Sequence, residues 1–324
     1  MINRSMVGAF ALAVSVTLPV NALSASIVDA FSSFWVLGDS LSDNGNLFAQ
    51  TGGTTPASPP YADGRFSNGP VWNEPILSEF DAANKPAENF AMGGATAVAD
   101  TIPGNNLATQ VGALTAQQGD FGDRPLVSLW FGANDLFDLI ADNVDPTAGA
   151  EAAANALADQ ITAIQALGVN DFLIFTLPDL GEIPNYALLQ PDLVDEATEA
   201  SIDFNAQLLE RIENADDALS VSVVDAFGLF NQLIADPTAF GVLDATLPCL
   251  FPSEEVAGLF GQPAICDADT ASQRAFYDSV HPNAVIHAGL TGQAVAAAVP
   301  LPAGAPLLLL GLALLGALRL RRAA

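Results

Sequence analysis

Two short segments, far apart in the chain, carry the residue types of a nucleophile and its base. Ser40 stands in a glycine-containing turn, Gly-Asp-Ser-Leu-Ser, directly after the apolar run at residues 34–37. Near the other end, Asp278 stands three residues before His281. An aspartate at this spacing can fix the tautomer of a histidine ring, which leaves the second ring nitrogen free to take a proton from a serine hydroxyl. These three residues predict nucleophilic catalysis by a serine.

The chain has only two histidines, so the choice of a base is narrow. His281 is followed by Pro282, which defines a junction between loop and helix, whereas His287 falls six residues later, inside the expected last helix. We therefore expect His281 to be the base and His287 to be a structural side chain that packs near the helix surface.

Two further segments offer hydrogen-bond donors. The first contains the pair Gly93 and Gly94, and the second contains Asn134 in the sequence Gly-Ala-Asn-Asp. A glycine lets a backbone N–H approach a developing oxyanion, and an asparagine side chain supplies another donor. Taken singly, each segment also has a structural interpretation, as a tight turn and as a helix N-cap. Their order along the chain, each after an apolar run, favours the catalytic interpretation.

The elements that must position these residues alternate between strand and helix. Short apolar runs predict five strands, at residues 34–37, 89–92, 126–131, 172–177 and 221–224. Longer segments predict four helices, at residues 106–118, 148–166, 192–218 and 283–298. This alternation is typical of a parallel sheet covered on both faces, because parallel strands need crossover connections. In such sheets the working residues gather beyond the carboxyl ends of the strands.

Two stretches interrupt this alternation and are interpreted as insertions in one domain. They cover residues 50–75 and 237–270. Their aromatic side chains, Phe66, Trp72 and Phe251, are candidates for contact with a lipid substrate, and ordinary loop packing is the alternative for each.

Together, the segments around Ser40, Gly94, Asn134 and His281 resemble the first, second, third and fifth sequence blocks of the GDSL-type branch of the SGNH hydrolase superfamily, and the similarity covers about residues 34–298. The resemblance implies Ser40 as nucleophile, His281 as general base and acid, and Asp278 as the residue that orients His281. It also implies an oxyanion hole made by the N–H groups of Ser40 and Gly94 with the Asn134 side chain. The fold implied is a three-layer α/β/α sandwich, flavodoxin-like, with a five-stranded parallel sheet. Neither a metal nor an organic cofactor is implied.

The function expected from this resemblance is the hydrolysis of carboxylic esters through an acyl-enzyme on Ser40. The same residues would also serve acyl transfer, phospholipid deacylation, or removal of acetyl groups from an extracellular polysaccharide. A surface-displayed binding protein with a retired site is an alternative of another class. The presence of all five implied residues favours an enzyme.

Both ends of the chain are typical of targeting segments. Residues 1–25 combine an early arginine, an apolar stretch and small residues, which predicts a signal peptide for export; a first transmembrane helix is the alternative, but the apolar run is short for one. Residues 299–324 combine Val-Pro-Leu-Pro-Ala, an apolar run and terminal arginines. This tail resembles the PEP-CTERM class of sorting signals, which implies an exosortase-type partner enzyme and transient membrane association through residues 303–318. A plain membrane anchor and a buried core helix are the alternatives. Residues 26–298 remain as the hydrolase domain.

Charge and cysteine content limit the possible partners and the cellular location of the protein further. The formal net charge is −28, and residues 26–298 carry five basic against 37 acidic side chains, a charge of −32. Nucleic-acid binding needs a basic patch, so this class is excluded, while a location outside the cell fits. In an exported protein, the two cysteines, Cys249 and Cys266, predict a disulfide. Two cysteines alone cannot form a four-ligand zinc site.

Overall fold

The structure, a computed structural model, describes residues 26–98, 105–141, 146–216 and 218–299. The predicted signal peptide and the apolar run of the predicted sorting tail lie outside these residues, so both remain predictions. Within the described ranges, no helix combines the length and the apolar character that crossing a bilayer would require.

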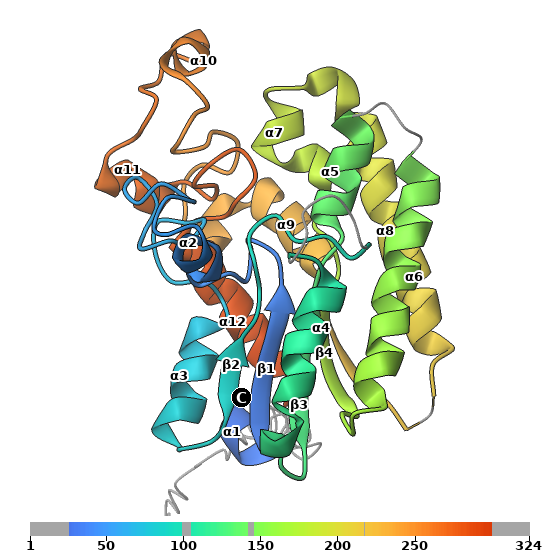
Figure 1. The fold of residues 1–324 in the computed structure, drawn as a ribbon. Coiled ribbons are helices and arrows are strands. Elements are labelled where there is room, and N and C mark those ends of the chain that lie inside the picture. Colours follow the sequence, from blue (N-terminus) through green and yellow to red (C-terminus); the bar gives the residue numbers. More distant parts are fainter. Residues whose placement is uncertain (1–25, 99–104, 142–145, 217, 300–324) are drawn as a thin grey trace, which may run out of the picture. The chain divides into compact units, whose positions relative to one another are not determined.

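A five-stranded parallel sheet forms the centre of the described domain (Figure 1), in the order β2-β1-β3-β4-β5. Its strands are β1 (Ser33–Gly38), β2 (Ala87–Asn89), β3 (Pro125–Trp130), β4 (Asp171–Phe175) and β5 (Ser220–Val224). All residues of the three inner strands are buried, which explains why these strands are nearly continuous apolar runs in the sequence. The predicted fold class is confirmed.

The second strand differs from the prediction. The sequence places it on the apolar run at residues 89–92, but β2 ends at Asn89. The backbone N–H groups of Phe90 and Met92 still donate hydrogen bonds to carbonyls near the end of β1, at 2.8 and 3.0 Å. Beyond Asn89 the open edge of β2 bonds locally and not to another strand, since the Asn89 side chain accepts the N–H of Ala91 at 2.8 Å. As an edge strand, β2 is only partly buried, so its composition gives a weak signal.

Helices cover both faces of the sheet. On one face α3 (Glu74–Ala82) packs on β1 and β2, and α12 (Ala284–Ala298) packs on β4 and β5; on the other, α4 (Leu107–Ala116), α6 (Pro146–Gln165) and α8 (Val194–Glu213) form a layer (Figure 1). The remaining α-helices are α1 (Ile27–Ala30), α2 (Asn46–Gln50), α5 (Ala133–Ala141), α7 (Pro184–Ala187), α9 (Ala226–Ala235), α10 (Glu254–Leu259) and α11 (Ala268–Gln273). Single 3₁₀ turns occur at η1 (Gln118–Asp120), η2 (Leu180–Glu182), η3 (Pro191–Leu193) and η4 (Pro237–Phe240).

The bounds of two long helices show where local sequence is informative. The last helix starts as predicted, because the side chain of Asn283 accepts the N–H of Ile286 at 3.0 Å and caps it. The helix predicted to run to residue 218 instead ends at Glu213, with Asn214 as its C-cap. Of the predicted extension, the described residues 214–216 and 218 are not helical.

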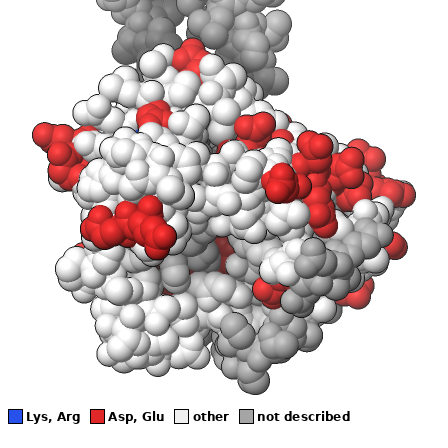
Figure 2. All heavy atoms as spheres, turned by 90° about the horizontal axis from the view of Figure 1, so that it is seen from above, with Lys and Arg blue, Asp and Glu red and all other residues white. Residues whose placement is uncertain are grey.

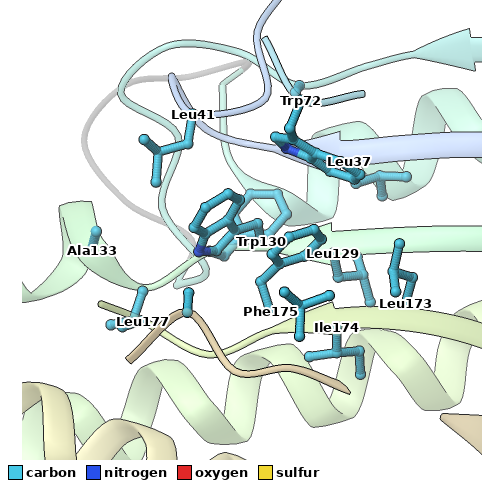
Figure 3. Close-up of a cluster of buried hydrophobic side chains, with 14 of the residues drawn as sticks. Leu37, Leu41, Trp72, Leu129, Trp130, Ala133, Leu173, Ile174, Phe175 and Leu177 are labelled. Carbon is cyan, nitrogen blue, oxygen red and sulfur yellow. The ribbon is translucent and has the colours of Figure 1, made fainter. Parts of the chain in front are cut away.

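An aromatic cluster lies at the carboxyl ends of the central strands (Figure 3). The ring of Trp130, the last residue of β3, stacks on Phe175, the last residue of β4, with centroids 4.4 Å apart. Trp72 packs against the same Phe175 at 4.5 Å and donates its indole N–H to Ser42 at 3.0 Å. Trp130 pairs in register with Gly38, the residue before the Ser40 turn. Trp72 is thus a core residue that supports this turn, not a surface contact for lipid.

The two interpreted insertions extend from the end of the domain at which the strands finish (Figure 1). In the second one, a disulfide joins Cys249 to Cys266, with their Cα atoms 5.0 Å apart. The ring of Phe251 is buried there and stacks on Phe260. The buried guanidinium of Arg274 donates to the carbonyl of Pro248 and so ties the segment to the body of the domain.

Candidate active site

The turn that carries Ser40 leaves β1 where its last residue, Gly38, has no room for a side chain. A Cβ atom on Gly38 would lie 2.9 Å from the side chain of Ser42. Gln110 of α4 holds both backbone polar groups of Gly38, accepting its N–H at 2.9 Å and donating to its carbonyl at 2.8 Å. After this anchored position the chain turns sharply, since the carbonyl of Asp39 accepts the N–H of Ser42 at 3.0 Å. Ser40 itself remains partly exposed at the end of the strand.

The structure brings Ser40, His281 and Asp278 into one hydrogen-bonded row. The Oγ of Ser40 lies 2.7 Å from Nε2 of His281, and Nδ1 of His281 lies 2.7 Å from Oδ2 of Asp278. The other carboxylate oxygen accepts the backbone N–H groups of Val280 and His281 at 2.8 and 2.7 Å. The hydroxyl of Tyr61 donates to Oδ2 at 2.6 Å. This geometry allows a proton to pass from the serine hydroxyl to the imidazole.

The residues expected to form an oxyanion hole surround the same hollow as Ser40. Ser40, Gly94, Asn134 and His281 all line one pocket. Gly94 has a φ of +77°, a conformation that side-chain-bearing residues rarely adopt. Asn134 lies in the first turn of α5, and its Nδ2 donates to the carbonyl of Ala95 at 2.9 Å. The order of the segments and the family resemblance suggested this grouping, and the structure brings all of these residues together around one pocket.

Two buried carboxylates hold the segment that contains Gly94, a role that the sequence did not reveal. Oδ2 of Asp43 accepts the N–H of Gly93 at 2.8 Å, and the same carboxylate also accepts the backbone N–H groups of three residues at the start of α2. Asp135 accepts the N–H groups of Ala97 and Val98 at 2.8 and 2.9 Å. The only available signal was their place in the sequence, because Asp43 directly follows the Gly-Asp-Ser-Leu-Ser turn and Asp135 ends the Gly-Ala-Asn-Asp segment. The two carboxylates therefore fix the backbone of the expected oxyanion hole from both ends.

Burial and charge shift the acid–base properties of the groups around Ser40. Burial raises the pKa of Asp39 to about 7, although the N–H of Leu41 and the charge of His281 oppose the shift. Burial acts in the same direction on Asp278, but the attraction of His281 together with its hydrogen bonds outweighs it and lowers the pKa of Asp278. Asp278 is therefore a carboxylate beside the imidazole, while Asp39 remains largely protonated below neutral pH.

The pocket beside Ser40 has a volume of about 240 Å³. Its walls are mainly apolar side chains, contributed by the Ser40 turn, α5 and the segments after β4 and before α12: Leu41, Phe66, Phe137, Pro178, Leu180, Ile183 and Val280. Phe66 comes from the interpreted insertion at residues 50–75, and its ring lies 5.1 Å from the ring of His281. The polar groups are concentrated where Ser40, Asn134 and His281 meet. This arrangement suits an apolar group whose reactive end is polar.

His287 lies deeper than its sequence position suggested. Its side chain is completely buried in α12, not near the helix surface, and neither ring nitrogen has a hydrogen-bond partner among the described residues. Burial, followed by the charge of His281, lowers the pKa of His287 to about 3. A ring that is neutral and enclosed in this way is not in a position to exchange protons with a substrate.

The face at which the strands end is shown from above in Figure 2. Asp and Glu side chains gather toward the sides of this face, whereas its hollowed centre is mostly uncharged. Among the described residues drawn in this view, no Lys or Arg is seen. An anionic ligand would meet repulsion on approach to such a face.

Comparison with known proteins adds independent information. The family model of GDSL-like lipases and acylhydrolases matches residues 35–290. The phosphatidylcholine-sterol acyltransferase of Aeromonas hydrophila is 30% identical over 304 residues, which cover 81% of this chain and 88% of that protein. The thermolabile hemolysin of Vibrio parahaemolyticus is 26% identical; the match covers 80% of this chain and 62% of the hemolysin, less than two thirds of its length.

A similar solved structure is that of LAE5, an α/β hydrolase enzyme from the metagenome of Lake Arreo, Spain. It shares 16% sequence identity and a TM-score of 0.46, and the match covers 84% of this chain and 97% of that one. The family assignment depends on the sequence matches: the family model spans most of the chain, and the acyltransferase is matched over 88% of its length. The chain therefore belongs to the GDSL-like lipase/acylhydrolase family and is a hydrolase that acts on ester bonds.

Proposed function

We propose that this protein is an exported serine hydrolase that cleaves carboxylic esters through an acyl-enzyme on Ser40. The observation that carries the proposal is the continuous row Ser40–His281–Asp278, with both contacts at 2.7 Å, at the polar end of an apolar pocket. Export is supported by the sequence pattern of residues 1–25 and by the acidic character of the chain.

The proposed reaction has two steps. Nε2 of His281 takes the proton of Ser40 as Oγ attacks the ester carbonyl, and the oxyanion turns toward the N–H groups of Ser40 and Gly94 and the amide of Asn134. The intermediate collapses, the alcohol leaves with the proton from His281, and the acyl group remains on Oγ. A water that gives its proton to His281 then attacks the acyl-enzyme, which releases the acid and restores the serine. Asp278 stabilises the imidazolium that forms in each step.

The pocket indicates the acyl part of the substrate. Phe66, Leu180 and Val280 supply apolar walls for a hydrocarbon chain, and a volume of about 240 Å³ fits a short or medium chain better than a long one. The acidic periphery favours neutral or zwitterionic esters over anionic ones (Figure 2). We therefore propose a neutral ester of a short or medium acyl chain as the preferred substrate.

A second candidate function is transfer of the acyl group to an alcohol other than water. It is favoured by the 30% identity with a phosphatidylcholine-sterol acyltransferase. The same serine, histidine and aspartate would form the acyl-enzyme, and the two functions differ only in which hydroxyl attacks it. Phospholipid deacylation and polysaccharide O-deacetylation use the same first step.

The test compares the purified protein with its Ser40→Ala and Ser272→Ala variants. Ser272 lies exposed in α11, so its substitution is a matched control. The substrates are p-nitrophenyl acetate, butyrate, octanoate and palmitate, and phosphatidylcholine vesicles with and without cholesterol. We expect Ser40→Ala to lower kcat/KM by about 10⁴-fold or more and Ser272→Ala to leave it unchanged. Equal turnover by all three proteins would refute the proposal.

The product pattern separates the candidate functions. Free acid with either vesicle supports hydrolysis, whereas cholesteryl ester formed only with cholesterol supports acyl transfer. If all of these substrates remain intact, release of acetate from an acetylated polysaccharide supports the deacetylase. If no acetate is released either, a binding role is supported. Export and tail removal are tested separately, by the intact mass of the protein recovered outside the cells. We expect the mass of a chain that begins after Ser24 or Ala25 and lacks the apolar tail.

A further inference from the structure

Tyr61 contacts the Ser40–His281–Asp278 row from a distant part of the sequence. Its hydroxyl donates to Oδ2 of Asp278 at 2.6 Å, across 217 residues of sequence. This oxygen is also the one that faces Nδ1 of His281 at 2.7 Å. The contact therefore lies on the atom through which Asp278 acts on the imidazole, and not on the oxygen that the backbone N–H groups already occupy.

The segment around Tyr61 is held firmly against the loop that carries Asp278 and His281. The hydroxyl of Tyr277 donates to the carbonyl of Pro60 at 2.6 Å, immediately before Tyr61. Farther along, Ser67 donates to the carbonyl of Pro282 at 3.0 Å. The ring of Tyr61 packs against the rings of Phe66 and Tyr277, with centroid distances of 6.0 and 5.5 Å. These two ring contacts, together with the hydrogen bonds before and after Tyr61, restrict the positions that its hydroxyl can adopt.

We propose that Tyr61 is a positioning residue of the active site, whose hydroxyl holds Oδ2 of Asp278 in place and reduces the attraction of that oxygen for the proton on His281. The proposal rests on the proposed function, because it assigns His281 the role of base. A hydrogen bond to a carboxylate withdraws part of its charge, so Oδ2 is a weaker partner for an imidazolium with Tyr61 than without it. A weaker partner leaves the imidazole neutral, and able to accept the serine proton, down to a lower pH.

The other ionisable groups near Asp278 and His281 are the same in the protein with and without the Tyr61 hydroxyl. Asp39 and His287 interact electrostatically with His281, and Tyr277 interacts with Asp278. Burial, and then the charge of Asp278, raises the pKa of Tyr61 well above its usual range, so the phenol remains a donor throughout the working pH range. Replacing Tyr61 by phenylalanine removes one hydrogen bond to Asp278 and neither adds nor removes a charged side chain.

The test is the variant Tyr61→Phe, which keeps the ring and its packing and removes only the donor. We expect kcat to fall about tenfold and the acid limb of the kcat/KM profile to move about half a pH unit or more toward higher pH, as for loss of a hydrogen bond to a charged group. The matched control is Tyr186→Phe, which removes a buried phenol hydroxyl in α7 and no hydrogen bond to Asp278 or to the segment around Tyr61. Its acid limb should remain at the wild-type pH. An unshifted limb in Tyr61→Phe, or an equal shift in both variants, overturns the proposal.

A second measurement needs no substrate. The chain has only two histidines, and the ring of His287 is buried, so the NMR signal of the His281 ring can be followed through a pH titration. We expect its titration midpoint to move upward in Tyr61→Phe and not in the control Tyr186→Phe. If Tyr61→Phe does not fold, the test is 3-fluorotyrosine incorporation into Tyr277→Phe, compared with unlabelled Tyr277→Phe. The fluorinated phenol is more acidic and therefore a stronger donor, so we expect the His281 midpoint to move downward. An unchanged midpoint overturns the proposal.

These results are distinguishable from failure of the proposed function. An unchanged rate in Ser40→Ala would refute the serine mechanism, whereas the NMR midpoint reports on Tyr61 in either case.

Discussion

Asp39 provides a quantitative test of how burial acts next to the nucleophile. The side chain is only 1% exposed, and one of its oxygens accepts the N–H of Leu41 at 2.9 Å. Burial raises its pKa from 3.8 to about 7. The variant Asp39→Asn has nearly the same size and remains neutral at every pH, so it imitates the protonated carboxyl group.

The direction of the effect follows from proton binding. Between pH 3.8 and about 7, Asp39 is protonated in the folded protein and ionised in the unfolded chain, so the folded protein binds more protons. The free energy of unfolding therefore falls as pH rises through this window and does not change further above it. A pKa difference of about three units corresponds to about 4 kcal/mol, which is the expected upper size of the loss.

The assay is urea denaturation of the wild type and Asp39→Asn at constant ionic strength, from pH 4 to pH 8.5. Subtracting the two profiles removes the titration of all groups that the proteins share. Relative to the wild type, we expect the free energy of unfolding of the variant to rise by up to about 4 kcal/mol between pH 4 and pH 7 and to rise no further above pH 7.5. The matched control, Asp81→Asn at an exposed position of α3, should give a flat difference. A difference for Asp39→Asn that stays within about 0.5 kcal/mol across the range would refute the reasoning.

Three further predictions concern the oxyanion hole, the disulfide and the charge. Asn134→Ala should lower kcat by about 10²- to 10³-fold with little change in KM, because the donor acts on the charge that forms during the reaction; steady-state kinetics that show a change in KM alone would contradict this role. Replacing Cys249 and Cys266 by serine should lower the free energy of unfolding by about 3 kcal/mol, since the bridge closes a loop with a sequence separation of 17; an unchanged urea midpoint would count against it. The Tm should rise with sodium chloride, because salt screens the repulsion within the −32 body; a steady fall between low and molar salt would be inconsistent with this explanation.

Local sequence was sufficient for features that depend on neighbouring residues. The inner strands are continuous apolar runs because both faces of the sheet are covered, and this pattern is visible without any tertiary contact. The spacing of Asp278 and His281, and the glycine before Ser40, are likewise local, since a loop or turn of a few residues sets them. The α/β/α architecture and the grouping of these residues at one edge follow from connecting parallel strands by helices.

The tertiary structure decided what depends on residues distant in sequence. No periodicity in the chain indicates that Tyr61 contacts Asp278, because nothing in the sequence specifies how the segment from residue 50 to 75 is placed. The burial of single side chains could not be predicted from the sequence either. Asp39 and His287 have shifted pKa values because of what surrounds them. Trp72 is in the core because α12 and the strands enclose it. Local pattern thus determined the elements and their order, whereas packing between distant segments decided which polar groups lost water and which partners they gained.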